Sequence, residues 1–200
     1  MARPVDEARA ARRRAEITLA AAELFARKGY EGTTAADIAR AAGISAGSVF
    51  YYFADKRAVF RSVFERDLPL SRKLVERCHA ESDPLSGLLV MVDELVEPAM
   101  DSSASGILVE LLRQVGNDPL LMRAITENAA IIQHGLAELI ERAIAVGVVD
   151  ATLDPLPAAA WIQSIIDGVF LNAAPDFDPR PPLRRTVLGF LTPPTKESTR

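Results

Sequence analysis

The chain has very few of the residue types that form covalent cross-links or bind metal ions. Its 200 residues include one cysteine, two histidines and one tryptophan. Since Cys78 is alone, no disulfide can form within the chain, which fits a reducing compartment, and we expect a cytoplasmic protein. No uninterrupted apolar run approaches the ~20 residues of a membrane helix, and no apolar segment follows the N-terminal arginines. We therefore expect neither a membrane span nor secretion.

The histidines are also too few to support a metal centre. Glu76 and His79 have the Glu-x-x-His spacing of helical di-iron sites, but such sites need two copies, and Ile131 stands where a glutamate would precede His134. No glycine-rich phosphate loop, zinc-ligand spacing or Gly-x-Ser-x-Gly elbow occurs, and Cys78 has no paired base. We expect no catalytic residue, no metal ligand and no cofactor.

Charge is unevenly divided along the chain. Residues 1–66 carry 12 Lys and Arg against 8 Asp and Glu, a net +4, whereas residues 67–200 carry 11 against 19, a net −8. This division favours a basic N-terminal module that meets a polyanion, although an ordinary solvated surface also produces such an imbalance. With 49% apolar residues, the chain can fill one small and one larger core.

Two short helices joined by a glycine turn are predicted in the first third of the chain. Thr34 is an N-cap candidate with Asp37 three residues later, which is the spacing of a capping box. Gly43 ends this helix, and Ser45 is the N-cap candidate of a second helix that runs to about Tyr52. So short a turn fixes the two helices at a steep angle, as in a helix-turn-helix unit.

The second of these helices has small residues first and aromatic residues afterwards. Residues 45–48 are small enough to let the helix backbone approach DNA closely. Tyr51 and Tyr52 bring hydroxyls that reach phosphate oxygens. Val49 and Phe53 are four residues apart and should pack inward. For Phe50 and Phe53 we favour packing in the core of a small bundle.

Residues 33–56 contain most of the positions of a known sequence pattern. It consists of Thr33-Thr34, Asp37-Ile38-Ala39, Ala42-Gly43-Ile44-Ser45, Gly47-Ser48-Val49-Phe50-Tyr51-Tyr52-Phe53 and Lys56. This pattern resembles the DNA-binding signature of TetR-type transcriptional regulators, and the close match runs from about Arg13 to Phe60. The resemblance implies that the DNA-binding residues are Thr33, Thr34, Ala36, Ser45, Ala46, Gly47, Ser48, Tyr51, Tyr52 and Lys56.

The segment also departs from the family pattern. The family usually has tyrosine where this chain has Phe50, so that hydroxyl contact is lost. Alanines at positions 35, 36 and 46 replace long base-reading side chains, so the resemblance does not imply an operator sequence. The arginines at positions 3, 9 and 12–14 form either an arm along phosphates or in a minor groove, or a solvated leader.

The remainder of the chain has the apolar period of α-helices. Helices are predicted from Asp55 with a kink or division at Pro69, from Asp83 to about Pro98, from Ser102 or Ser103 to Gly116, from Pro119 to about Val146 with a Glu138–Arg142 pair outside, from Asp154 to Asn172, and from Pro182 to Leu191.

These predictions, together with the resemblance, indicate an all-α fold of about nine helices. We expect a three-helix helix-turn-helix DNA-binding domain in residues 1–60, a helical ligand-binding and dimerisation domain in residues 61–192, and a disordered tail in residues 193–200. The last two helices are apolar on more than one face, which favours a four-helix bundle formed with a second copy.

A second domain of this size exceeds what DNA binding alone requires. We therefore expect a ligand-gated regulator, acting as a repressor, that binds a palindromic double-stranded DNA operator as a homodimer and is released by a small, mainly apolar effector. The expected pocket wall consists of Met91, Leu95, Met100, Leu108, Leu111, Met122, Ile125, Ile132, Trp161 and Ile165, with Asn128, Gln133 or Asp167 as polar anchors.

Other interpretations of the second domain stay open. The same apolar positions are what the core of any helical bundle uses. An architectural or constitutive DNA-binding protein without an effector has a filled core there, and this is the first alternative. A helical-bundle enzyme is the second, although the sequence offers no active-site motif for it.

Overall fold

A computed structural model describes residues 4–172, 174 and 176–192 of the chain. The described residues form ten α-helices and two 3₁₀ helices and contain no strand. The predicted all-α class is thus confirmed, with one α-helix more than the approximate number expected. The tail predicted at residues 193–200 and the arginine at position 3 lie outside the described residues.

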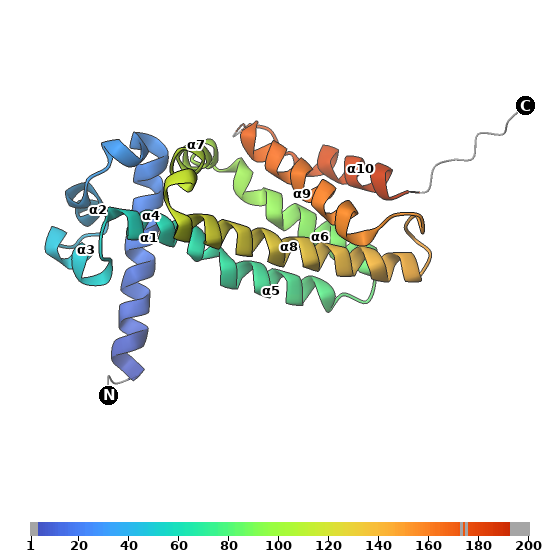
Figure 1. Ribbon diagram of the computed structural model, residues 1–200, viewed down its shortest axis with the longest axis horizontal. Helices are drawn as coiled ribbons and strands as arrows, with labels where there is room; N and C mark the ends of the chain where they lie inside the picture. The colour runs from blue at the N-terminus through green and yellow to red at the C-terminus, as the bar shows by residue number, and fades with distance from the viewer. Residues whose placement is uncertain (1–3, 173, 175, 193–200) are drawn as a thin grey trace, which may run out of the picture. The chain divides into compact units, whose positions relative to one another are not determined.

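The described helices group into two compact units (Figure 1). Unit 1 consists of residues up to Leu68 together with Ser103–Thr126. Unit 2 consists of Pro69–Ser102 and the residues from Glu127 onward. The division expected from the sequence, at residue 60, falls within a helix of unit 1. The expected second domain also included residues 103–126, whereas in the structure these residues group with the N-terminal helices.

Unit 1 is built around its first helix. Its elements are α1 (Pro4–Gly32), α2 (Ala35–Ala41), α3 (Ala46–Tyr52), α4 (Lys56–Glu65), α7 (Ala104–Gln114), the 3₁₀ helix η2 (Val115–Asn117) and the start of α8 (Pro119–Ala145). α1 packs mainly against α7 and α4. Because α1 begins at Pro4, residues 9–14 are helical in the structure, and they form neither an extended arm nor a disordered leader.

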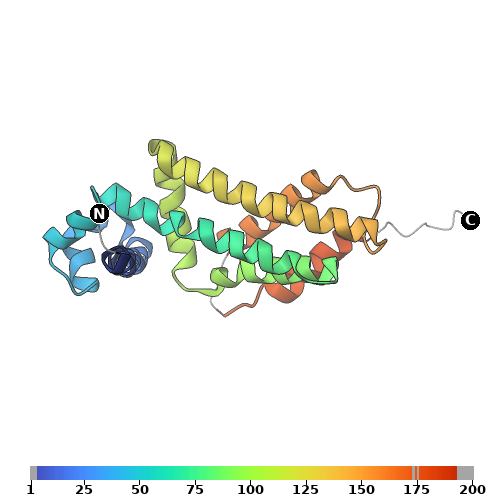
Figure 2. The same ribbon diagram turned by 90° about the horizontal axis from the view of Figure 1, so that it is seen from below.

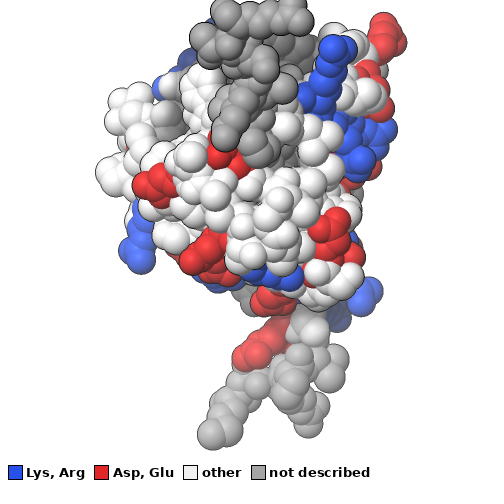
Figure 3. Space-filling model, turned by 90° about the vertical axis from the view of Figure 1, so that its right-hand side faces the viewer, with Lys and Arg blue, Asp and Glu red and all other residues white. Residues whose placement is uncertain are grey.

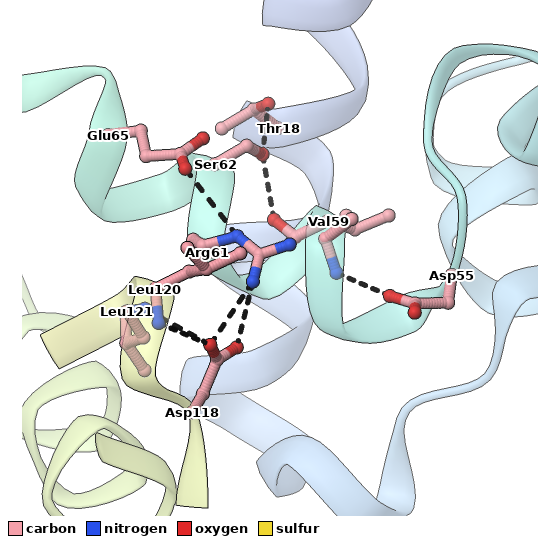
Figure 4. A network of polar contacts seen from close by, with 10 residues as sticks. Thr18, Asp55, Val59, Arg61, Ser62, Glu65, Asp118, Leu120 and Leu121 are labelled. Atoms are coloured by element: carbon pink, nitrogen blue, oxygen red, sulfur yellow. Dashed lines mark hydrogen bonds and ion pairs between the residues drawn. The ribbon is translucent and has the colours of Figure 1, made fainter. Parts of the chain in front are cut away.

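Aromatic rings fill the centre of unit 1. Phe25 of α1 and Phe60 of α4 are fully buried and meet edge to face, with ring centroids 5.0 Å apart. Tyr30 packs against both rings. A buried hydroxyl chain joins the same two helices, since Thr18 Oγ1 lies 2.7 Å from Ser62 Oγ, which in turn donates to a backbone carbonyl of α4 (Figure 4). α1 and α4 are therefore held by both apolar and polar contacts.

Two buried carboxylates attach residues 103–126 to the rest of unit 1. Glu110 of α7 accepts a hydrogen bond of 2.8 Å from the backbone N–H of Tyr30. Asp118 accepts from Arg61 of α4 at 3.1 Å, and its Oδ1 also accepts from the backbone N–H groups of Leu120 and Leu121 in the first turn of α8 (Figure 4). One carboxylate thus caps a helix and neutralises an arginine.

Unit 2 is a bundle of helices with an aliphatic core. It contains α5 (Asp67–His79) from Pro69 onward, α6 (Pro84–Val96), the 3₁₀ helix η1 (Glu97–Met100), α8 from Glu127, α9 (Pro155–Leu171) and α10 (Arg180–Leu191). Figures 1 and 2 both show α5 running alongside α8. The two helices approach closely at Gly135, where a Cβ would lie 2.6 Å from a methyl group of Val75. The core here is closely packed.

Two sequence predictions about this bundle need correction. The division predicted at Pro69 occurs at Arg66, because a proline in the first turn of a helix needs no N–H partner and is tolerated inside α5. The predicted Glu138–Arg142 pair is wrong. Glu138 lies 3.3 Å from His79, and Arg142 donates to the backbone carbonyls of His79 and Glu81. No helix among the described residues has the length and apolar content that a membrane span requires.

Candidate nucleic-acid interface

The turn between α2 and α3 is fixed at both helix starts by side-chain caps. Thr34 Oγ1 accepts from the N–H of Asp37 at 3.1 Å, and Asp37 accepts from the N–H of Thr34 at 3.1 Å, which completes the predicted capping box. Ser45 Oγ accepts from the N–H of Ser48 at 3.2 Å. Gly43 has a φ of 65°, in the left-handed region that glycine adopts without strain. The predicted helix starts are confirmed, and local chemistry orients α3.

The capping box also perturbs a carboxyl group. Hydrogen bonds from the hydroxyl and the backbone N–H of Thr34, followed by one from Lys28, lower the pKa of Asp37 to about 2. Asp37 is therefore ionised at neutral pH. Its charge lies in the first turn of α2, where it complements the helix dipole.

The two sides of α3 differ sharply. Val49 and Phe53 are buried and hold the helix on the unit 1 core, as predicted. The opposite side exposes Ala46 and Gly47 at the start of the helix, followed by Tyr51, which is 81% exposed. The prediction that Phe50 packs in the core is wrong, since it is 51% exposed. A helix of seven residues has room for only a narrow inward face, and Val49 and Phe53 already occupy it.

The other predicted contact residues of unit 1 differ in accessibility. Thr34 and Ala36 are exposed beside α3, and Tyr52 is half-buried against Tyr51 with ring centroids 5.0 Å apart. Thr33 is fully buried and donates to the carbonyl of Gly29 at 2.8 Å. Because its side chain has no accessible surface, we remove Thr33 from the candidate interface.

Lys56 is accessible but already has partners within the protein. Its ammonium group donates to the carbonyl of Tyr30 at 2.8 Å and lies 4.2 Å from the centroid of the same ring. It also lies 3.9 Å from a carboxylate oxygen of Glu31. A lysine has three N–H donors and one of them bonds the carbonyl of Tyr30, so donors remain for a phosphate. The side chain therefore fixes the end of α1 and keeps a positive charge beside α3.

Two arginines near this surface have roles that the sequence did not predict. Arg14 donates to the carbonyl of Tyr52 and lies over the ring of Phe53, at 4.3 Å from its centroid, so it holds the end of α3. Arg40 is exposed in the last turn of α2, four residues after Ala36 on the same face. The i, i+4 spacing from Ala36 is the signal that identifies Arg40, whereas no local signal pairs Arg14 with α3.

The residues predicted to line an effector pocket are divided between the two units. Leu108, Leu111, Met122 and Ile125 belong to unit 1, whereas Met91, Leu95, Met100, Asn128, Ile132, Trp161 and Ile165 belong to unit 2. Met91 and Ile132 are buried in the core of unit 2, while Met122 and Trp161 are exposed on the surface, contrary to the predicted placement. Asn128 differs from all of these, since its side-chain Oδ1 is buried and has no hydrogen-bond partner among the described residues.

Charge is dispersed on the surface seen in Figure 3. Uncharged side chains form broad areas there, between separate acidic and basic groups (Figure 3). No extended patch of one sign covers the described part of this face.

Comparison with known proteins is consistent with this geometry. Residues 17–63 match the model of the tetR family of bacterial regulatory proteins, and residues 84–188 match that of the C-terminal part of BetI-type transcriptional repressors. The HTH-type transcriptional repressor Rv1474c of Mycobacterium tuberculosis is 28% identical over 177 residues, which cover 88% of this chain and 90% of the relative.

Solved structures show the same fold. The fatty acid degradation regulator FadR from Bacillus halodurans superposes with a TM-score of 0.76 at 25% identity, covering 88% of this chain and 95% of its own. FadR from Bacillus subtilis, solved in complex with stearoyl-CoA, gives 0.72 at 22% identity, covering 88% and 96%. The second family match spans more than half of the chain. The protein belongs to the TetR family of bacterial transcriptional regulators, with a C-terminal part of the BetI-type repressors.

Proposed function

We propose that this regulator is a ligand-responsive repressor, which binds a palindromic operator as a homodimer and is released by a small, mainly apolar effector. The exposed side of α3 is the observation that carries the proposal. Small residues at Ala46 and Gly47 leave the helix backbone accessible, Tyr51 projects beside them, and two side-chain caps hold the helix in place. Docking of a recognition helix in a major groove needs such a surface.

The residues of the candidate interface have proposed roles on the duplex. Contacts to phosphate oxygens position the protein, and contacts to base edges give sequence preference. We assign phosphate contacts to Thr34, Ser48, Tyr51, Tyr52 and Lys56, and we add Arg40 to this set. The residues nearest the base edges are Ala36, Ser45, Ala46 and Gly47.

Capture of genomic fragments by the purified protein, followed by sequencing, identifies the operator. Fluorescence anisotropy with a recovered fragment then gives the Kd at several salt concentrations. Phosphate contacts release counterions, so we expect affinity to fall steeply as salt rises. For six or more phosphate contacts, the affinity should fall by about 10³-fold or more between 50 and 200 mM salt. An affinity that does not change over this range contradicts phosphate-mediated binding.

One substitution tests whether α3 is the docking element. Ala46→Arg places a long side chain on the exposed start of α3 and is expected to block docking or change base preference. Ala145→Arg is the matched control, because it adds the same charge at an exposed helical alanine of α8. Equal affinity of the two variants for the operator contradicts the assignment of α3.

The proposed dimer is supported by the surfaces of α9 and α10. Trp161 and Leu171 on α9 and Leu188 on α10 are exposed apolar side chains at the end of the chain. A two-fold dimer buries them and presents two α3 helices to a palindrome.

The proposed effector site is supported by Asn128. This residue lies between Ile125 and Ile132 on the inward stripe of α8, and a buried amide oxygen without a partner destabilises a fold by about 1–3 kcal/mol. A ligand that donates a hydrogen bond to Asn128 from an otherwise apolar body removes this penalty. The stearoyl-CoA bound to FadR from Bacillus subtilis is an apolar chain with a polar head, and it gives a first class of probe.

Asn128→Leu tests this site with opposite effects on stability and response. Leucine has nearly the same shape without the unpaired oxygen, so we expect the variant to be more stable by about 1–2 kcal/mol in urea unfolding. Release from the operator by stearoyl-CoA is expected in the parent protein and lost in the variant. Equal release of both proteins contradicts the role of Asn128, and no release by any apolar compound favours a constitutive regulator.

A further inference from the structure

Phe50 is the exposed aromatic side chain of α3 that has no proposed role on the duplex. It is 51% exposed and lies one helical turn after Ala46, on the same outward side of the helix. The space in front of Gly47 is open, because beyond its two neighbours the nearest side-chain atom to the place of its Cβ is Ser45 Oγ, at 3.9 Å. The side of α3 that carries Ala46 and Phe50 therefore presents apolar carbon to whatever lies against it.

The same helix has no side chain that reads a purine by paired hydrogen bonds. Residues 45–54 include no arginine, lysine, asparagine, glutamine, histidine or acidic residue. Bidentate contacts to guanine need arginine or lysine, and those to adenine need asparagine or glutamine. The hydroxyls of Ser45 and Ser48 lie 2.8 Å apart and bond each other, so only one hydroxyl hydrogen of the pair remains for a base. With Tyr51 assigned to a phosphate, the main direct contact left to α3 is apolar.

The base edges of the major groove carry one apolar group, the C5-methyl group of thymine, which alanine and phenylalanine side chains contact. We infer that Phe50 reads thymine methyl groups in the operator, with the methyl group of Ala46 beside it. This inference rests on the proposed docking of α3 and names the chemistry of its base recognition. The phenyl ring has no polar atom, so the methyl group is the part of a base edge that it can cover without leaving a donor or acceptor unpaired.

The backbone that carries Phe50 is fixed on both sides. Val49 is 1% exposed and Phe53 is 3% exposed, so both anchor α3 in the core of unit 1. Arg14 donates to the carbonyl of Tyr52 and lies over the ring of Phe53, which holds the end of the helix. Because half of the Phe50 surface is free, its replacement should change the contact with DNA much more than the fold.

Replacement of thymines by deoxyuridine in the recovered operator fragment tests the inference, with the Kd from fluorescence anisotropy as the readout. Deoxyuridine lacks only the C5-methyl group and keeps every hydrogen-bonding atom of thymine. From the burial energy of one methyl group, we expect the Kd to rise about fourfold at a thymine that faces Phe50, and about 15-fold when the same position is changed in both half-sites. Thymines outside the half-sites should show no effect.

Variants at position 50 show whether the phenyl ring is the group that reads the methyl. Phe50→Ala should bind the thymine and deoxyuridine operators with nearly equal Kd, because the variant has already lost the contact that the methyl group makes. Phe50→Tyr keeps the ring and should keep the preference for thymine. Leu19→Ala is the matched control, since Leu19 is an apolar side chain of α1 with a similar exposure of 55%, and it should change neither Kd. Circular dichroism should show an intact fold in all three variants.

The outcomes separate this inference from the proposed function. A protein that captures no specific fragment overturns the proposed function and this inference with it. An operator whose Kd is unchanged by deoxyuridine at every thymine overturns methyl recognition alone, and the docking of α3 then still stands if Ala46→Arg abolishes binding. A loss on deoxyuridine that persists in full in Phe50→Ala overturns the role of the ring, because the methyl group then acts through the shape of the duplex or on another residue.

Discussion

Replacing Asp118 by alanine is expected to lower the free energy of unfolding of unit 1 by about 3–4 kcal/mol. Asp118 is 5% exposed, and its carboxylate accepts from two backbone N–H groups of α8 at 3.0 and 3.1 Å. Loss of such a cap costs about 1 kcal/mol. Arg61, whose side chain is 17% exposed, also loses its partner at 3.1 Å, but it keeps Glu65 at 3.5 Å. Because Arg61 keeps this second partner and is partly exposed, we expect loss of the Asp118–Arg61 ion pair to cost about 2–3 kcal/mol, which is no more than the lower end of the cost of breaking a fully buried pair.

Asp118→Asn is the control that separates the cap from the charge. Asparagine keeps an oxygen for the N–H groups of Leu120 and Leu121 and removes only the negative charge, so the expected loss is about 2–3 kcal/mol. Urea unfolding followed by far-UV circular dichroism, at one protein concentration, measures both variants. Equal losses would show that the cap contributes nothing, and losses below about 0.5 kcal/mol in both would refute the ion-pair argument.

Three further changes have definite expected outcomes. The pKa of Asp37 is lowered from 3.8 to about 2, so the contribution of the ionised Asp37 carboxylate to folding stability is complete above pH 4 and is lost as the pH falls toward 2. Thr34→Ala removes the hydroxyl that bonds this carboxylate and should raise its pKa in a carbon-detected NMR titration. Burial, followed by the nearby Glu94 charge, raises the pKa of the Cys78 thiol, so a thiol reagent should modify it only as fast as the protein unfolds, and rapid modification of the native protein would contradict this. Gly106→Ala places a Cβ 2.4 Å from a backbone oxygen of α1 and should destabilise the protein by about 1–3 kcal/mol in urea unfolding, whereas Gly116→Ala, with no atom within 4 Å, should change little.

The features that the sequence predicts correctly are those set by neighbouring residues. The starts of α2 and α3 follow from Thr34 with Asp37 and from Ser45 with Ser48, pairs only three residues apart. The inward position of Val49 follows from helical periodicity. A local rule suffices in each case, because the interaction that decides the structure lies within one helical turn.

The features that the sequence does not predict depend on contacts between distant residues. Glu110 bonds the backbone of Tyr30, 80 positions earlier, and Asp118 bonds Arg61, 57 positions earlier. These contacts place residues 103–126 in unit 1, and no local pattern indicates them. The predicted pair of Glu138 with Arg142 fails for the same reason. Arg142 instead donates hydrogen bonds to two backbone carbonyls at and just beyond the end of α5. These bonds stabilise the fold more than an exposed ion pair with Glu138, which contributes only about 0.3–0.5 kcal/mol.

The attachment of α7 to α1 determines how a displacement in residues 103–126 is transmitted within unit 1. At Gly106 the backbones of the two helices are almost in contact, so a side-chain rotation cannot absorb a shift of α7. Four residues later, Glu110 holds the N–H of Tyr30, directly after Gly29, whose φ of 76° breaks the helical path of α1. Thr33 is buried against the carbonyl of that same glycine, and Thr34 caps α2. We therefore expect a shift of α7 to reach the first residue of the helix-turn-helix unit through hydrogen bonds between side chains and backbone groups, which are more directional than an apolar contact.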